Sequence, residues 1–227
     1  MGILNRFKKN KEQNSDTQIN EDLHAQESST LHQENYSEET ATVNHGPYDY
    51  NEAREKSKCL NMGAIKVPAI ADMQIIPDPS PQEGYYTSVT LLIDDSALNL
   101  MVLSDSKTSS IWNELLELLS QDTHENNGTF TEQKGSFGKE YIVKTPVTTP
   151  DGRKATETMC LIGFEGPRWV LRTIITGKAL NDEQARNTVD EILNKIVVDR
   201  GENPIPPGEI LLLTLPDNLA DMLQEKE

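Results

Sequence analysis

The stretch "FEGPRWVLRTIITG", residues 164–177, joins a Gly-Pro corner directly to an apolar strand. Proline has no N–H and cannot lie inside a sheet ladder, so Gly166-Pro167 must form a turn. Beyond the turn the side chains alternate between two faces of a sheet, with Trp169, Leu171, Thr173 and Ile175 on one face and Val170, Arg172 and Ile174 on the other. The stretch therefore predicts the last strand of a meander, and its entry corner carries Arg168 beside Trp169.

Further strands are predicted before and after this corner. Residues 89–102 form a hairpin that turns at "DDS", and two strands at 139–149 and 154–164 are joined by "PDG". In that second turn Pro150 sets φ, and Gly152 accepts a positive φ. Short apolar runs broken by proline at 63–70 and 73–79 indicate edge strands or an extended entry segment. Residues 203–216 add a final extended run after a proline-rich turn.

Two segments carry helical periodicity. In residues 108–121 an apolar stripe follows candidate caps at 108–110, and it consists of Ile111, Leu115, Leu118 and Leu119. Residues 181–201 carry a second stripe, with Asn181 as the expected cap, Gln184 completing a capping box and Gly201 at the end. Residues 123–130, "THENNGTF", are predicted to be a loop that leaves His124 exposed.

The order of elements is strands, helix, three strands, helix, strand. Hairpins outnumber crossover connections, so we predict an α+β fold with a mainly antiparallel sheet of about six to seven strands. The two main helices are expected to pack on one face of this sheet. A single domain over residues 46–216 is predicted, followed by a short C-terminal helix or tail at 217–227.

Residues 1–45 differ sharply from the rest of the chain. A basic tip at 1–11 carries Arg6, Lys8, Lys9 and Lys11, whereas residues 12–45 contain eight acidic groups and neither lysine nor arginine. Such a segment buries too little apolar surface to offset the entropy of ordering its backbone. We therefore predict a disordered N-terminal tail. Ile3, Leu4 and Phe7 in the tip allow a weak contact with a membrane surface but no stable anchor.

Composition excludes several classes of protein. With 37 Asp plus Glu against 21 Lys plus Arg, the formal net charge is −16, which disfavours binding to a nucleic-acid backbone. No apolar run reaches the roughly 18–20 residues of a transmembrane helix. Cys59 and Cys160 stand far apart without a CxxC partner. They indicate a reducing compartment, and we expect a cytoplasmic protein.

The sequence carries no recognisable catalytic, cofactor or metal motif. His124 is the one clear histidine in the folded region, and no GxSxG, phosphate-binding loop or HExxH pattern is present. The acidic pair Asp94-Asp95 falls at a hairpin turn, where carboxylates are common. We predict no catalytic, cofactor-binding or metal-ligating residues, although distant carboxylates and an arginine assembled by the fold would escape a linear motif.

The corner at residues 166–169 is the best candidate for a site. Trp and Arg are the residues that interfaces favour, so Arg168 and Trp169, with Tyr48 and Asp49 nearby, predict a surface for an unknown protein partner. In this hypothesis the chain is a non-enzymatic interaction or regulatory domain. The sequence equally allows a structural role for the corner, in which Trp169 packs at the end of the core and Arg168 pairs with a nearby carboxylate. The alternative is a domain, or an enzyme without a recognisable motif, that binds a small anionic ligand through Arg168, Arg172 or Arg200.

Five short motifs carry a resemblance to a known family. They are "GPYD" (46–49), "IKVP" (65–68), "GPRW" (166–169), "TG" (176–177) and "DRG" (199–201). In order and spacing they resemble the actinobacterial proteins grouped as domain-of-unknown-function family 3710, over residues 46–216. The family usually has Trp where this chain has Tyr48, and often Arg where it has Lys66. The resemblance implies a cytoplasmic actinobacterial protein and assigns no activity or catalytic residue.

Overall fold

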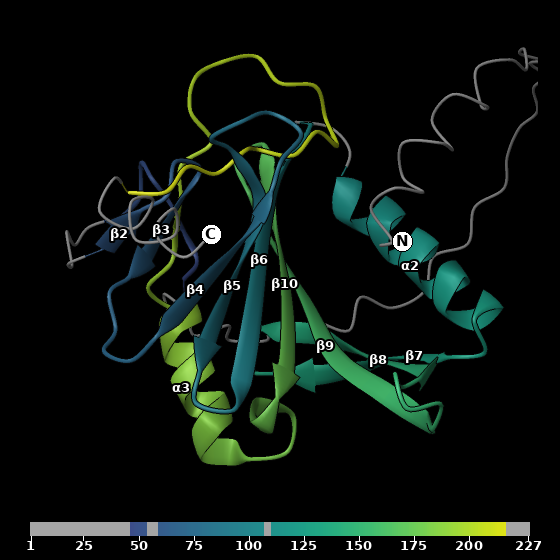
Figure 1. The fold of residues 1–227 in the computed structure, drawn as a ribbon. Helices are drawn as coiled ribbons and strands as arrows, with labels where there is room; N and C mark the ends of the chain where they lie inside the picture. Colours follow the sequence, from purple (N-terminus) through teal and green to yellow (C-terminus); the bar gives the residue numbers. More distant parts are fainter. Residues whose placement is uncertain (1–45, 54–58, 107–109, 217–227) are drawn as a thin grey trace, which may run out of the picture. The chain divides into compact units, whose positions relative to one another are not determined.

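The computed structural model describes residues 46–53, 59–106 and 110–216. These residues form a seven-stranded antiparallel sheet, a smaller four-stranded sheet and two α-helices (Figure 1). The predicted α+β fold is confirmed. The tail predicted for residues 1–45 and the helix or tail predicted for residues 217–227 lie outside the described residues.

The large sheet has the strand order β4-β5-β6-β10-β9-β8-β7. Its strands are, in that order, Gln74–Pro79, Tyr86–Ile93, Ser96–Ser104, Trp169–Gly177, Lys154–Gly166, Gly138–Thr148 and Thr129–Gly135. The hairpin of β5 and β6 and the meander of β8, β9 and β10 are as predicted. Strand β7 was not predicted. Of the loop expected at 123–130, the first three residues, His124 among them, belong to the helix Ile111–Glu125, and the last two begin β7. As an edge strand with mostly exposed side chains, it lacks the apolar alternation by which strands are recognised.

The small sheet has the order β1-β11-β3-β2. Its strands are Tyr48–Asp49, Val197–Val198, Ile65–Pro68 and Cys59–Asn61. The pairing of β1 with β11 is parallel, and the other two pairings are antiparallel. The entry segment of the domain therefore lies directly beside a strand that comes almost 150 residues later in the chain.

The first helix begins where the sequence predicts but runs longer, whereas the second begins and ends differently from the prediction. Helix α2, Ile111–Glu125, begins at the expected cap, because Ser110 Oγ accepts a hydrogen bond from the Trp112 N–H. Helix α3, Glu183–Leu193, is capped by Asp182 and not by Asn181, since a 3-10 turn over Lys178–Leu180 precedes it. It ends well before Gly201 because Val197–Val198 pair with β1 and β3.

The helices pack on opposite faces of the large sheet, which corrects the expectation of a single covered face. Val189 and Ile192 of α3 share the main core with Trp169 and Cys160. Trp112 of α2 lies on the other face against Gly163, where a Cβ atom would come within 2.1 Å of the indole ring. Both faces need a cover because β9 and β10 bury apolar side chains on each of them.

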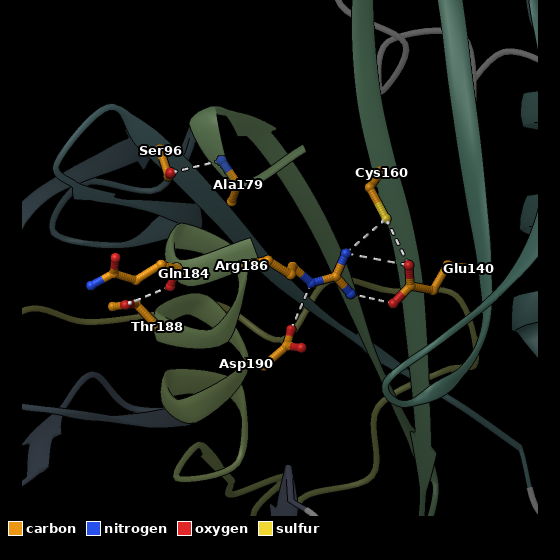
Figure 2. Close-up of polar contacts among 8 residues, drawn as sticks. All are labelled: Ser96, Glu140, Cys160, Ala179, Gln184, Arg186, Thr188 and Asp190. Carbon is orange, nitrogen blue, oxygen red and sulfur yellow. Dashed lines mark hydrogen bonds and ion pairs between the residues drawn. The ribbon is translucent and has the colours of Figure 1, made fainter. Parts of the chain in front are cut away.

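A buried ion-pair network fastens α3 to the sheet (Figure 2). Arg186 Nη1 of α3 donates to Glu140 Oε2 of β8 at 3.3 Å, and Arg186 Nη2 donates to the other carboxylate oxygen. Arg186 Nε also donates to Asp190 Oδ1 at 2.7 Å. The Glu140 side chain is only 1% exposed. Because a buried carboxylate without a cation is costly, this network fixes where the helix lies.

We expect Glu140→Ala to lower the free energy of unfolding by about 3 kcal/mol, because Arg186 would lose its bidentate partner in a largely buried place. Glu132→Ala is the matched control. It removes the Glu132–Lys139 pair, whose side chains are 49% and 72% exposed, and should cost less than about 1 kcal/mol. Urea unfolding of both variants measures the difference. Equal losses of stability would contradict a structural role for the network.

Candidate functional site

A pocket of about 420 Å³ lies where the motifs "GPRW" and "DRG" meet two other segments of the chain. The described residues that line it are Asp105, Ser106, Arg168, Arg200, Pro204, Ile205 and Pro206. They come from the end of β6, the turn between β9 and β10, the segment after β11 and the proline-rich segment that follows. The structure thus brings together Arg168 and Arg200, two of the three arginines predicted to bind an anionic ligand.

Arg168 occupies an unusual backbone conformation in the β9–β10 turn. Gly166 pairs with Trp169, so Pro167 and Arg168 form a two-residue turn. The φ angle of Arg168 is 64°, in the left-handed region that favours glycine. The Arg168 carbonyl accepts hydrogen bonds from Asp105 N at 2.9 Å and Arg200 Nε at 3.3 Å. These bonds hold the strained turn and leave the Arg168 side chain exposed.

Arg200 is held beside Arg168 by backbone carbonyls. Besides its bond to Arg168, Arg200 Nη1 donates to Asn203 O at 2.9 Å and Gly201 O at 3.3 Å. Among the described residues no carboxylate forms an ion pair with either arginine. Burial and then the charge of Arg168 hold the pKa of Arg200 below its ordinary value. Two positive charges therefore share one pocket.

The carboxylate of Asp105 is occupied elsewhere in the fold. Its Oδ1 accepts from the backbone N–H of Ser106 at 2.7 Å and of Ile111 at 3.1 Å. Ile111 is the first residue of α2, so Asp105 joins the end of β6 to the start of the helix. A carboxylate near a helix N-terminus is stabilised by the helix dipole. Asp105 lines the pocket but forms no ion pair with either arginine.

Trp169 lies in the core and not beside Arg168 on the surface. It is only 2% exposed, and its Nε1 donates to Asp49 Oδ2 at 2.8 Å. Its ring packs over Gly166, where a Cβ atom would come within 2.1 Å of it. The expected surface pair is thus separated, because alternation points Trp169 into the core face. Asp49 is buried and Tyr48 half-buried, so neither Trp169 nor Asp49 is accessible to a partner.

The entry segment positions Arg200 through the small sheet. Tyr48 N donates to Ile196 O and Tyr50 N donates to Val198 O, both at 2.9 Å, which fixes β1 along β11. Lys66 of β3 contacts both the entry segment and the residue that precedes Arg200. Its Nζ lies 3.7 Å from the centre of the Tyr50 ring and 3.6 Å from Asp199 Oδ2. Asp199 directly precedes Arg200, so docking of residues 46–51 helps to fix the pocket.

Asp49 stays ionised inside this contact. Burial by itself raises the pKa of Asp49, but the hydrogen bonds from Trp169 and Asn51 lower it, and the balance lies below the ordinary value. A carboxylate that accepts several N–H bonds is stabilised in its charged form. The Asp49–Trp169 contact is therefore a charge-assisted hydrogen bond at neutral pH.

Arg172, the third predicted arginine, does not reach the pocket. It projects from the opposite face of β10, where its Nη2 donates to Asn99 Oδ1. Burial lowers the pKa of Arg172 to about 10, against a raising effect of the Asp78 charge. Alternation along the strand already places Arg172 on the face away from Trp169.

The other reactive side chains give no sign of catalysis. Burial first, and then the Glu140 charge, raise the pKa of the Cys160 thiol to about 12, so it is protonated and a poor nucleophile at neutral pH. His124 is exposed, and its Nδ1 lies 2.7 Å from the Ser120 carbonyl oxygen. Within residues 46–53, 59–106 and 110–216, no group of three His, Cys, Asp or Glu side chains is placed to hold a metal ion. In the same ranges no helix is long and apolar enough to span a membrane.

Comparison with known proteins identifies the family. A family model described as "Protein of unknown function (DUF3710)" matches residues 46–222, and the chain therefore belongs to this family. No curated protein matches the chain. The solution structure of cyanobacterial PsbP (CyanoP) from Synechocystis sp. PCC 6803 is 6% identical, with a TM-score of 0.34 over 60% of this chain and 87% of that one.

We expect Arg168→Gly to be more stable than Arg168→Ala by about 1 kcal/mol, because glycine adopts a positive φ without strain and alanine does not. Both variants lack the arginine side chain, so the difference in their stability measures the cost of a positive φ at residue 168. Thermal or urea unfolding measures it. Identical stability of the two variants would show that the turn is not strained at this residue.

We expect Asp49→Asn to lower the free energy of unfolding by about 1 kcal/mol at neutral pH, because a neutral acceptor replaces a charged one for Trp169. The folded-state pKa of Asp49 lies below its ordinary value of 3.8. The contribution is therefore present above that value and is lost as the pH falls through the folded pKa. When unfolding is measured from neutral to acidic pH, the difference in stability between the parent chain and Asp49→Asn should shrink as the pH falls. Asp95→Asn, at an exposed turn, is the control, and a gap independent of pH would contradict this account.

Proposed function

We propose that this member of the family is a non-enzymatic binding domain whose Arg168–Arg200 pocket holds the anionic group of a small ligand. The observation that carries the proposal is the pair of guanidinium groups. They line one pocket, and no described carboxylate forms an ion pair with either of them. Guanidinium groups bind carboxylate and phosphate oxygens with directed N–H donors.

Electrostatics supports an anion at this place. Two like charges in one partly apolar pocket repel each other. Burial first, and then the charge of Arg168, lower the pKa of Arg200. When an anion is bound, the guanidinium groups of Arg168 and Arg200 each face an opposite charge, and the electrostatic interaction becomes attractive for both. The interaction would gain strength wherever the ligand excludes water.

The Arg168 backbone supports the same conclusion. A non-glycine residue at a φ of 64° costs stability at an exposed turn, where glycine would fit without strain. Strained residues cluster at sites where a particular side chain is needed. Arg200, in turn, is pre-oriented by its hydrogen bonds to backbone carbonyls, which reduces the entropy lost on binding.

A protein-interaction function is the hypothesis that the sequence favoured first. The burial of Trp169 removes the aromatic half of the surface on which it was based. The meeting of Arg168 and Arg200 in one pocket supports the alternative of a domain that binds an anionic ligand. A cytoplasmic location and an actinobacterial source stay predictions. Cys160, a buried thiol outside any disulfide, supports a reducing compartment.

We expect at least one anion to raise the melting temperature of the full chain in an Arg168-dependent way, because a ligand that binds the folded state stabilises it. A panel of phosphate, sulfate, citrate, acetate and phenylacetate is added at constant ionic strength. Arg168→Ala should lose the response. Arg153→Ala, which removes an exposed arginine at the β8–β9 turn, should keep it. Responses that are equal in the two variants, or absent from the parent chain, would contradict the proposal.

A further inference from the structure

The apolar side of the pocket is formed by a segment that hydrogen bonds hold in place. Pro204, Ile205 and Pro206 line it. The Ile205 carbonyl accepts a hydrogen bond from Ser104 Oγ at 3.0 Å, and Ile205 also packs against the main core. The Ser104 carbonyl accepts from Gly208 N at 2.8 Å. Hydrogen bonds thus join the segment to the end of β6 at Ile205 and at Gly208. The segment offers an apolar surface beside the two arginines.

The charges of the pocket favour a single negative charge. Among the described lining residues, two guanidinium groups and the Asp105 carboxylate leave one net positive charge. Asp105 is nearly buried, and it is held in place by the backbone of Ser106 and Ile111. One negative charge therefore balances the described charges of the pocket, whereas a dianion would leave an excess negative charge beside the Asp105 carboxylate. On this ground a carboxylate suits the pocket better than a phosphate monoester.

The donors of the pocket also suit a small anionic group. Nε and Nη1 of Arg200 already donate to backbone carbonyls, which leaves Nη2 for a ligand. No described carboxylate pairs with the Arg168 side chain, which keeps all of its N–H donors for a ligand. A carboxylate has two oxygens and can accept from both arginines at once. The volume of about 420 Å³ exceeds what such a group fills, and the prolines and Ile205 line the remainder.

We propose that the ligand is a small monocarboxylic acid with an apolar body. Its carboxylate accepts hydrogen bonds from Arg168 and Arg200, and its apolar body packs on Pro204, Ile205 and Pro206. This inference rests on the proposed function, because it names the ligand class of the same pocket. Burial of the apolar body removes apolar surface from water and thereby adds to the affinity.

Isothermal titration of the full chain tests the ligand class with four matched probes. Phenylacetate has both the carboxylate and the apolar body, acetate lacks the body, phenylacetamide lacks the charge, and phenyl phosphate carries a dianion on the same ring. We expect phenylacetate to bind at least tenfold more tightly than each of the other three. Arg168→Ala should abolish this binding. Ile205→Ala should weaken phenylacetate and leave acetate unchanged.

The outcomes separate the ligand class from the proposed function. Tighter binding of phenyl phosphate or acetate, still lost in Arg168→Ala, overturns the apolar monocarboxylate and leaves the anion-binding function standing. A fifth titration uses a short peptide that ends in phenylalanine. If this peptide binds more tightly than phenylacetate, the assignment to a small free acid is overturned in favour of a protein C-terminus. Absence of any Arg168-dependent binding overturns both proposals.

Discussion

The buried hydrogen bond between Trp169 Nε1 and Asp49 Oδ2 is the contact on which the arrangement of the site depends. It joins the start of β10 to the entry segment, although 120 residues separate the two. The entry segment pairs in parallel with β11, and β11 leads directly to Arg200. The Arg168 carbonyl, one residue before Trp169, accepts from Arg200 Nε. One tryptophan thus fixes the turn that carries Arg168 and, through β1, the strand that positions Arg200.

The regular part of the fold could be predicted from local patterns. Alternation and turn residues identify the β5–β6 hairpin and the β8–β9–β10 meander, because each strand of these units contacts its neighbour in sequence. Strand β7 escaped prediction because its side chains are mostly exposed on a sheet edge. Helix α3 is shorter than its periodicity indicates, since Val197 and Val198 gain more from pairing in the small sheet than from another helical turn. The alternation of side chains along the strands also does not indicate which helix covers which face of the large sheet.

The candidate site was predicted in part. Arg168 and Arg200 were both singled out, but their meeting depends on the parallel β1–β11 pairing, a contact over long sequence separation that leaves no local pattern. One signal for the strained residue was available, because a two-residue turn that starts with Pro167 places Arg168 where type II turns require a positive φ. The burial of Trp169 follows from its place on the same face as Leu171 and Ile175, both of which are core residues.

The central claim is that Arg168 and Arg200 hold one anion between them, and the side-chain Nε–H resonances of the arginines report this most directly. The parent chain, with these signals assigned by substitution, is titrated with sodium phenylacetate at constant ionic strength. The account predicts that the Arg168 and Arg200 signals move together along one saturating curve, while that of the exposed Arg153 stays in place. Signals of Arg168 and Arg200 that move no more than that of Arg153, or that follow separate curves, would contradict it.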